Sequence, residues 1–266
     1  MEKLPLLMTA SVDTRGMSHA RFSTKEREEM YLSTLQLYGR KLLDKGNYTL
    51  VFADNSGWDL GRLKAGLPEK YLHKIEFLSF DPADFDISRG KGYNEVLLIQ
   101  AAIEQSVYIR RAQAFLKVTG RYPVHNIRYF LDYGSREIME KGKELYIDIK
   151  DHNLYRKLGL NWCSRFADVR LFGVTSAFFL RYVATENHTL NDMEGKLLEG
   201  LMYNVIKPRM ESRQLVYRFN REPRFGGREG TLIPAFSFDE DQRSFKSRLK
   251  RLTGNILRLV APGFLF

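Results

Sequence analysis

The sequence contains little cysteine and no long apolar run, and both shortages narrow the class of protein. Cys163 is the single cysteine among 266 residues, which excludes an internal disulfide framework. No stretch reaches the roughly 20 consecutive apolar residues that a membrane-spanning helix needs. The first five residues include an acid and a proline and lack the pattern of a signal peptide. These absences predict a protein that is cytoplasmic or lies on a membrane surface.

Familiar nucleotide-binding and metal-binding motifs are missing as well. The glycine-containing stretch at residues 88–92 has neither the spacing nor the Lys-Ser/Thr ending of a Walker loop, and it is not a dinucleotide fingerprint. The five histidines are scattered without the spacing of metal ligands. Hydrophobic residues make up 44% of the chain and charged residues 28%, which is typical of a folded globular protein.

The net charge of +10 favours an anionic partner, and part of the charge is concentrated near the C-terminus. Residues 242–266 contain no acid, and their apolar residues recur at helical spacing with most cations on the other face. We expect an amphipathic helix that binds an anionic membrane surface through residues 243–266. A helix packed on the domain with a solvated basic face is the alternative. No nucleic-acid motif accompanies the charge, so nucleic acid is not an expected partner. The cations are Arg243, Lys246, Arg248, Lys250, Arg251 and Arg258.

Strand-like and helix-like segments alternate along the chain. Apolar, β-branched stretches predict strands at residues 4–10, 48–53, 74–80, 114–118, 145–149 and 169–179. Helical patterns occupy residues 24–44, 93–105 and 192–205, and a flexible basic loop is expected at residues 88–92. Such alternation predicts an α/β fold with a mainly parallel sheet and flanking helices. We expect one domain over residues 1–220, followed by a linker and a basic amphipathic segment over residues 221–266.

The strongest functional signal is the segment Phe-Leu-Lys-Val-Thr-Gly-Arg-Tyr at residues 115–122. It predicts a buried strand that ends in a glycine turn, at the sheet edge where open α/β sheets bind ligands. Lysine and arginine at this edge suit a diphosphate. A second basic stretch precedes the helix at residues 93–105, whose N-terminus attracts phosphate, although a solvated loop is the alternative. The candidate diphosphate ligands are Arg89, Lys91, Lys117, Thr119 and Arg121.

Two further polar loops follow the first and second predicted strands. Because the carboxyl ends of parallel strands meet at one edge, these loops are expected to contact the same ligand. The second loop, Asp-Asn-Ser-Gly, also has the composition of an ordinary Asx turn. The candidates for holding a nucleoside are Thr9, Asp13, Asp54, Asn55 and Ser56.

These motifs together resemble the nucleotide-sugar half of GT-A-like glycosyltransferases. The resemblance spans about residues 4–205 and rests on Asp-Asn-Ser-Gly, Arg-Gly-Lys-Gly-Tyr-Asn-Glu and above all Lys-Val-Thr-Gly-Arg-Tyr. It is strongest toward bacterial enzymes that build lipopolysaccharide or capsule. The resemblance implies a GT-A-like catalytic domain that moves a sugar from a nucleotide sugar, most simply a UDP-sugar. The acceptor would be a cell-surface glycan or a lipid-linked molecule at the inner face of the cytoplasmic membrane.

The resemblance also implies a catalytic carboxylate and raises the question of a metal. GT-A enzymes usually hold Mg²⁺ or Mn²⁺ with Asp-x-Asp after the fourth strand, but here that place is basic, so we expect no metal cofactor. Asp148 and Asp151 are the alternative ligands for Mg²⁺ or Mn²⁺. Inversion at the sugar needs a base near the start of a later helix, which points to Glu194 and then Asp192. A capping role is the alternative for both, and a retaining enzyme needs no such base.

Acceptor contacts are expected from Trp162, Asp168 and Arg170, with Trp162 as a platform for stacking a sugar, although core packing is the alternative for an aromatic residue there. Two competing functional classes stay open. A nucleotidyltransferase or sulfotransferase also uses basic loops, but the carboxylate pair of the first and the N-terminal phosphate loop of the second are not visible in the sequence. A basic membrane- or nucleic-acid-binding scaffold without catalysis explains the charge but not the polar loops.

Overall fold

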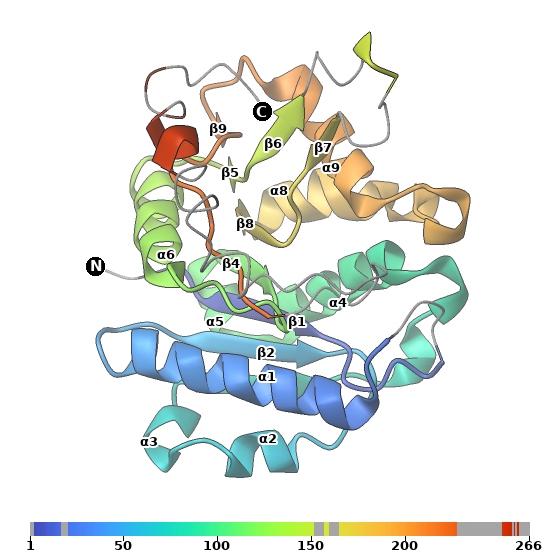
Figure 1. The fold of residues 1–266 in the computed structure, drawn as a ribbon, viewed down its shortest axis with the longest axis vertical. Helices are drawn as coiled ribbons and strands as arrows, with labels where there is room; N and C mark the ends of the chain where they lie inside the picture. The colour runs from blue at the N-terminus through green and yellow to red at the C-terminus, as the bar shows by residue number, and fades with distance from the viewer. Residues whose placement is uncertain are drawn as a thin grey trace.

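A seven-stranded sheet forms the centre of the molecule, and helices cover its two faces (Figure 1). The structure, a computed structural model, describes residues 3–16, 21–151, 157–159, 165–227, 252–256, 258 and 260. The strand order is β3-β2-β1-β4-β8-β5-β9, and β8 runs antiparallel to both of its neighbours. The α/β fold with a mainly parallel sheet is therefore confirmed. The strands are β1 Leu6–Ala10, β2 Leu50–Asp54, β3 Ile75–Ser79, β4 Ala114–Thr119, β5 Leu145–Tyr146, β8 Leu171–Thr175 and β9 Leu215–Val216.

The helices divide between the two faces of the sheet. α1 and α6 contribute to one hydrophobic layer, and α4, α5 and α9 contribute to the other. The first helix begins with a capping box in which Ser23 and Glu26 satisfy each other's backbone amides. The α-helices are α1 Thr24–Tyr38, α2 Gly61–Ala65, α3 Glu69–Leu72, α4 Lys91–Gln105, α5 Val107–Ala112, α6 Ile127–Ser135, α8 Ser176–Phe178 and α9 Leu198–Ile206.

Shorter turns extend or link these helices. π-Helical turns continue α1, α6 and α8, and 3₁₀ turns lie in the connections. The π-helical turns are Gly39–Leu43, Arg136–Glu140 and Phe179–Val183, and the 3₁₀ turns are Pro82–Asp84, Ile87–Arg89, Ala184–Thr189, Asp192–Glu194 and Lys207–Arg209.

Side chains along each strand alternate between the two layers, as the period of a β-strand requires. On β1, Leu6 and Met8 enter the layer of α1 and α6, whereas Leu7 enters the layer of α4. On β2, Phe52 enters the layer of α1 and α6, and Val51 enters the layer of α4. Both faces are apolar, which explains why the strands appear in the sequence as continuous hydrophobic runs.

The position of β1 determines where a ligand can bind. β1 pairs in parallel with β2 on one side and with β4 on the other. The chain builds the sheet outward through β2 and β3 and then returns to place β4 on the opposite side of β1. At such a reversal the loops after neighbouring strands diverge and leave a crevice at their carboxyl ends.

Three predicted elements differ from the structure. The predicted strand at residues 169–179 ends at Thr175, whose side chain accepts the Phe178 amide and begins α8. The predicted strand at residues 145–149 divides into β5 and β6 (Ile149–Asp151), and β6 pairs with β7 (Arg165–Ala167) in a separate two-stranded sheet. The predicted helix at residues 192–205 is a 3₁₀ turn, a left-handed Gly195 and then α9. Short apolar runs do not distinguish strand from buried helix, which accounts for the first error.

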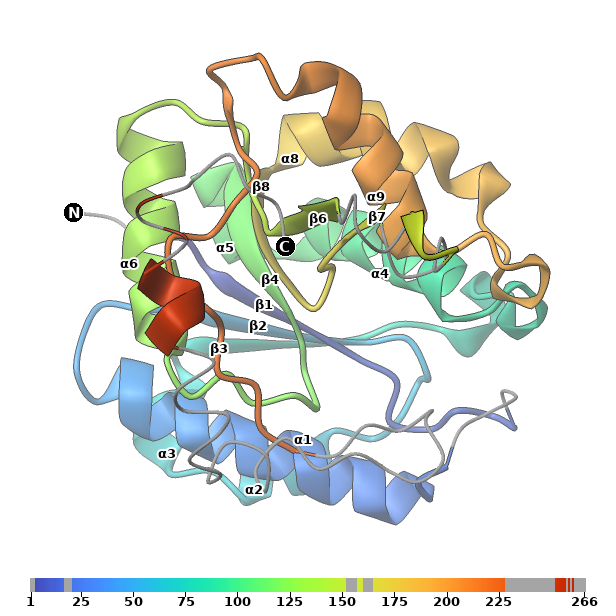
Figure 2. The same cartoon turned by 45° about the horizontal axis from the view of Figure 1, so that its top comes forward.

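The stretch at residues 221–227, expected to be part of a linker, is bound to the domain. His125 donates its amide to the Arg224 carbonyl, Arg224 donates its amide to Asn126, and Gly226 donates to the Pro123 carbonyl. The short helix at residues 252–256 lies beside α6 in both views of the fold (Figures 1 and 2). No helix in the described part of the chain is long and apolar enough to cross a membrane.

A buried ion pair attaches this C-terminal segment to the sheet. Arg258 donates to both carboxylate oxygens of Asp148, at 2.6 and 2.8 Å, and to the Phe219 carbonyl at 2.8 Å. Both side chains are 4% exposed. Arg258 was expected on a basic outer face and instead points into the domain, because the buried Asp148 needs a cation.

Replacing Arg258 with alanine should lower the free energy of unfolding by about 3–5 kcal/mol, because it leaves the buried carboxylate of Asp148 without its partner. Chemical denaturation measures the change. The control is Lys70→Ala, which breaks the exposed Lys70–Asp44 pair and should cost under about 1 kcal/mol. Equal effects of the two substitutions would show that the buried pair is not a structural anchor.

Candidate functional site

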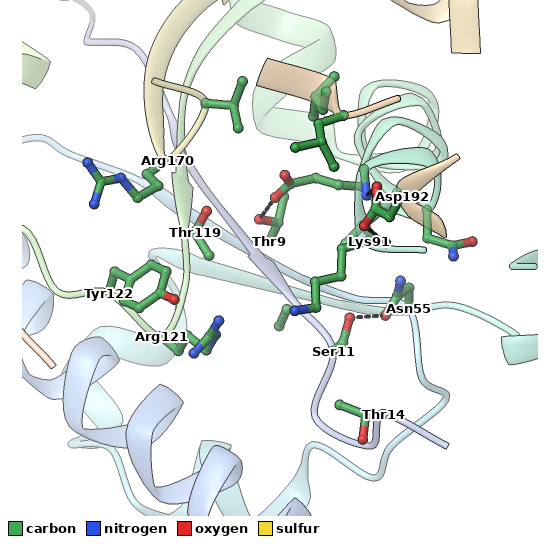
Figure 3. Close-up of a pocket in the computed structure, with 18 of the residues that line it drawn as sticks. Thr9, Ser11, Thr14, Asn55, Lys91, Thr119, Arg121, Tyr122, Arg170 and Asp192 are labelled. Atoms are coloured by element: carbon green, nitrogen blue, oxygen red, sulfur yellow. Dashed lines mark hydrogen bonds between the residues drawn. The ribbon is translucent and has the colours of Figure 1, made fainter. Parts of the chain in front are cut away.

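A pocket of about 410 Å³ opens at the carboxyl ends of β1 and β4. Its walls come from the loops after β1, β2 and β4, from the N-terminal part of α4, and from the segment that leads into α9 (Figure 3). These are the loops that the sequence predicted to meet. The polar and charged residues in the lining are Thr9, Ser11, Thr14, Arg27, Asn55, Lys91, Asn94, Glu95, Thr119, Arg121, Arg170, Asp192 and Glu199.

Asp54 joins the loop after β1 to the loop after β2. This carboxylate is fully buried and accepts hydrogen bonds from the Val12 amide at 2.8 Å, the Ser56 amide at 2.9 Å and the Ser56 hydroxyl at 2.7 Å. The Ser56 hydroxyl in turn accepts the amide of Asp13. Asp13, Asp54 and Ser56 are outside the lining, so their predicted contact with a nucleoside gives way to a role in shaping the loops. Asn55 does line the pocket.

Arg27 and Tyr31, on α1, hold the loop after β1 from below. Arg27 donates its Nε to the Ser11 carbonyl at 2.7 Å and an Nη to the Tyr31 hydroxyl at 3.2 Å. The Tyr31 hydroxyl also accepts the Ser11 amide at 3.0 Å. The hydroxyl of Ser11 donates to Asn55 Oδ1 at 2.6 Å, which fixes the orientation of the Asn55 amide beside the pocket. Arg27 and Tyr31 were not among the predicted site residues, because a helical sequence pattern does not indicate which distant loop a side chain contacts.

Lys117 lies beneath the pocket and does not reach a ligand. Its side chain is 0% exposed, and its ammonium group forms an ion pair with Glu95 Oε1 at 2.7 Å. It also donates to the Val169 carbonyl at 2.7 Å and to the Thr119 hydroxyl at 3.0 Å. An ammonium has three N–H donors, so all of them are used. The predicted contact between Lys117 and a diphosphate is therefore replaced by a structural role, which is to hold Glu95.

The rest of the 115–122 motif does form the pocket. The Gly120 amide donates to the Thr9 carbonyl at 2.9 Å, and a Cβ at Gly120 would lie 2.9 Å from that oxygen. This close approach brings the end of β4 against β1. Arg121 follows, with its guanidinium 4.4 Å from the centre of the Tyr122 ring. Nη1 of Arg121 is buried and has no hydrogen-bond partner among the described residues.

Lys91 extends into the pocket from the first turn of α4. Figure 3 shows its side chain running toward Ser11, with the Arg121 side chain directed toward the same space from the opposite wall. An anion bound between their ends would interact favourably with both cations. Lys91 and Arg121, both predicted to bind the diphosphate, thus line the same pocket.

Asp192 caps α4 from a distant part of the sequence. Its carboxylate accepts the Lys91 amide at 2.7 Å and the Gly92 amide at 3.4 Å. A carboxylate is stabilised at a helix N-terminus by the unpaired amides and the helix dipole. Gly90, with φ +89°, makes room for it, since a Cβ there would lie 2.4 Å from Cβ of Asp192. Asp192 lines the pocket and caps α4, whereas the alternative that the sequence left open was a cap on the helix predicted to begin at Asp192 itself.

Glu95 and Glu199 are the other carboxylates of the pocket. Glu95 lies one turn beyond Lys91 on α4 and accepts the Thr9 hydroxyl at 2.7 Å as well as Lys117. Burial raises the pKa of Glu199, and the nearby charges of Glu95 and Asp192 raise it further. Glu95 lies four residues after Lys91, and this spacing places both side chains on the same face of a helix. The sequence therefore contained a signal that could have identified Glu95 as a site residue.

Arg89 and Glu194, two residues with predicted functional roles, face away from the pocket. Arg89 donates to the carbonyls of His188 and Leu190 and packs on the ring of Tyr93. Glu194 pairs with Lys196 at 2.6 Å, a contact that lowers the pKa of the Glu194 carboxyl. Neither side chain lines the pocket.

The predicted acceptor residues are only partly described. Trp162 lies outside the described residues. Arg170 lines the pocket and forms two hydrogen bonds to Asp168, at 2.7 and 2.8 Å. Burial alone would raise the pKa of Asp168, but the charge and hydrogen bonds of Arg170 outweigh it and the pKa is lowered. Asp168 therefore fixes Arg170 at the pocket edge and is not itself in the lining.

The residues present do not fit a divalent metal of the Asp-x-Asp type. In the described part of the chain, no three carboxylate, histidine or cysteine side chains group as metal ligands would. Of the alternative ligands, Asp148 is bound to Arg258, and Asp151 accepts from Tyr203 at 2.8 Å and Lys207 at 3.2 Å. Both carboxylates thus have protein partners of their own.

Gly90→Ala should be more destabilising than an alanine at another positive-φ glycine. The backbone at Gly90 has φ +89° and ψ −169°, a conformation that costs other residues about 1–3 kcal/mol. The added methyl group would also displace Asp192 from the start of α4. Gly142→Ala, at φ +67° with open space around it, should cost about 1–2 kcal/mol from the backbone alone. Urea unfolding compares the two, and an equal loss would contradict the packing of Asp192 against Gly90.

Comparisons with known proteins give likenesses of fold. No family model matches the sequence, and no curated protein shows significant similarity to it. Among solved structures, core-mannan synthase A of Aspergillus fumigatus in its Mn/GDP form has 11% identity and a TM-score of 0.43, covering 77% of this chain and 70% of that chain. The galactosyltransferase LgtC with donor and acceptor sugar analogs has 8% identity and a TM-score of 0.42, covering 76% and 70%.

A third similar structure belongs to another class of enzyme. The CMP:2-keto-3-deoxy-manno-octonic acid synthetase complexed with CTP has 8% identity and a TM-score of 0.43, covering 79% of this chain and 87% of that chain. The neighbours named here are thus a mannan synthase, a galactosyltransferase and a CMP:2-keto-3-deoxy-manno-octonic acid synthetase. At these scores the likeness is one of fold alone, and the function has to be inferred from the pocket.

Proposed function

We propose that this protein is a glycosyltransferase that uses a nucleotide-sugar donor. The observation that carries the proposal is the convergence of Lys91 and Arg121 over a pocket at the carboxyl ends of the parallel strands. The buried Nη1 of Arg121, unpartnered within the described chain, suits a phosphate oxygen, and guanidinium and ammonium groups together match a diphosphate. A UDP-sugar is the donor that the sequence motifs favour.

The nucleoside lies beside the loops after β1 and β2. Ser11 and Asn55 supply hydroxyl and amide groups there and are joined by a hydrogen bond, while Glu95 orients the Thr9 hydroxyl. Thr119 and Arg121 also line the pocket. A site held rigid before ligand binding loses less entropy when the ligand arrives, which favours binding.

In the proposed reaction, an acceptor hydroxyl attacks the anomeric carbon of the sugar and the bond to the diphosphate oxygen breaks. The nucleoside diphosphate leaves with the bonding electrons, and Lys91 and Arg121 stabilise the charge that develops on it. Under inversion, the acceptor proton passes to a carboxylate. Glu199 is the better candidate than Glu194, because Glu199 lines the pocket and its raised pKa makes it the stronger base.

We infer that the leaving diphosphate is neutralised by these two cations and not by a divalent metal. The support is the residue chemistry at the end of β4, where Thr119 ends the strand and Arg121 follows it in place of a carboxylate pair. Since Glu95 is bound to Lys117 and Asp192 to the amides of α4, metal binding would require breaking existing contacts.

We further propose that the protein acts at an anionic membrane surface, on a glycan or lipid-linked acceptor of the cell surface. With Arg258 directed inward, Leu252, Ile256 and Val260 are left 58%, 50% and 71% exposed at intervals of four residues. Such spacing places the three on one side of a helix. The surrounding sequence at residues 242–266 is basic and free of acids, which suits the headgroups of an anionic membrane.

Calorimetric titration with UDP, GDP and CMP, each in Mn²⁺ and in EDTA, tests the donor site. One nucleotide should bind with micromolar affinity in EDTA as well as in Mn²⁺. Arg121→Ala should weaken that binding by at least about tenfold, since hydrogen bonds to charged groups contribute about 1.5–3 kcal/mol. Arg128→Ala is the matched control, because Arg128 is exposed and forms an ion pair with Asp132 outside the pocket.

Each other outcome has a separate meaning. Binding that requires Mn²⁺ would contradict neutralisation by cations alone and would direct attention to the carboxylates of the pocket. Failure of all three nucleotides to bind would overturn the proposed donor site and favour a basic scaffold without catalysis. A nucleotidyltransferase is distinguished by binding of a nucleoside triphosphate with release of pyrophosphate.

Vesicle flotation tests the membrane proposal. The protein should float with vesicles of phosphatidylglycerol and phosphatidylcholine and not with phosphatidylcholine alone. Leu252→Ser combined with Ile256→Ser should reduce binding by at least about tenfold, since burying one such side chain contributes roughly 1.5–3 kcal/mol. Val107→Ser is the control, because Val107 is 59% exposed on α5. Unchanged flotation of the double variant would remove these residues from the membrane-binding surface.

A further inference from the structure

We propose that Glu95 and Glu199 receive the sugar of the donor and restrict it to neutral, hydroxyl-bearing sugars, so that sugars with a carboxylate are rejected. The inference rests on the proposed function, since it assigns the part of the same pocket that the diphosphate does not occupy. The charge and hydrogen-bonding capacity of the Glu95 and Glu199 side chains define the class of sugar that fits.

Glu95 is held in one orientation by partners on two strands. Its Oε1 accepts the Thr9 hydroxyl and forms the ion pair with Lys117, each at 2.7 Å. These described contacts both use the same oxygen, and the side chain is 20% exposed within the pocket wall. A carboxylate accepts hydrogen bonds at both oxygens, so Oε2 remains available to a hydroxyl group of a sugar.

Glu199 adds a second acceptor from another element of the pocket wall. It lies in the first turn of α9, lines the pocket, and is close enough to Glu95 and Asp192 for both to raise the pKa of its carboxyl, after burial itself. Three acids thus influence this part of the pocket. Sugar hydroxyls donate hydrogen bonds to such groups, whereas another carboxylate would be repelled.

The cations beside these acids already have carboxylate partners. Burial keeps the pKa of Glu199 raised, although the charge of Lys117 lowers it. Lys117 is buried with all three donors in use, and Arg170 is bound by Asp168 through two hydrogen bonds. Lys91 and Arg121 point into the space assigned to the diphosphate. An anionic sugar placed beside Glu95 and Glu199 would therefore lose its hydration and meet only cations that already have carboxylate partners.

Paired donors that differ in a single carboxylate test the inference. Calorimetry at pH 8 compares UDP-glucose with UDP-glucuronate and GDP-mannose with GDP-mannuronate, and it measures UDP and GDP alone. The neutral member of the pair whose nucleotide binds should bind at least about tenfold more tightly than the acidic member, because like charges in a desolvated site repel. Glu199→Gln should reduce that ratio at least about threefold and leave the affinity for the nucleoside diphosphate unchanged.

Glu104→Gln is the matched control, because Glu104 is an exposed carboxylate on α4 and should leave the ratio at its wild-type value. Binding of the nucleoside diphosphate without preference for the neutral sugar, or a ratio unaffected by Glu199→Gln, would overturn this inference alone. No binding of any nucleotide or nucleotide sugar would overturn the proposed function together with it.

Discussion

The pocket depends on how one lysine is buried in the fourth strand. Moving an ammonium group out of water costs several kcal/mol unless it gains a counter-charge and hydrogen bonds. Lys117 gains both, from Glu95 on α4, from the Val169 carbonyl that precedes β8, and from Thr119 two residues along its own strand. The contacts of Lys117 thus hold α4, the residues that precede β8 and the end of β4 in fixed positions relative to one another. Glu95, held in this way, also holds Thr9 at the end of β1.

This arrangement separates positive from negative charge within one pocket. The cations Lys91 and Arg121 enter from loop and helix ends, where they project beyond the sheet. Glu95 lies one turn inside α4 and Glu199 in the first turn of α9, and burial raises the pKa of Glu199. A nucleotide sugar has the same division, with a dianionic linker between two polar, uncharged ends. Complementarity of this kind contributes to specificity as well as to affinity.

Local sequence patterns predicted the strands, the mainly parallel sheet and the polar loops at its edge, because alternation and turn chemistry act over a few residues. They also placed Thr9, Asn55, Lys91 and Arg121 in one pocket. Contacts between residues that are distant in the sequence have no such local signal. Asp192 caps a helix that begins about a hundred residues earlier, and Asp148 finds its counter-charge in Arg258. The family resemblance suggested Asp192 as a catalytic base and Asp148 as an alternative metal ligand, whereas the fold gives each a structural partner.

The 115–122 motif shows why residue type alone does not identify a ligand contact. Lys117 and Thr119 are two residues apart in β4 and so project from the same face of the sheet. Lys117 pairs across the sheet with Leu7 on one side and Phe172 on the other, a position in the middle of the strand and inside the core. Arg121 lies beyond the end of the strand, past the close approach at Gly120, and there a side chain reaches the pocket. The distance of a cation from the end of its strand therefore decides whether it supports the site or binds the ligand.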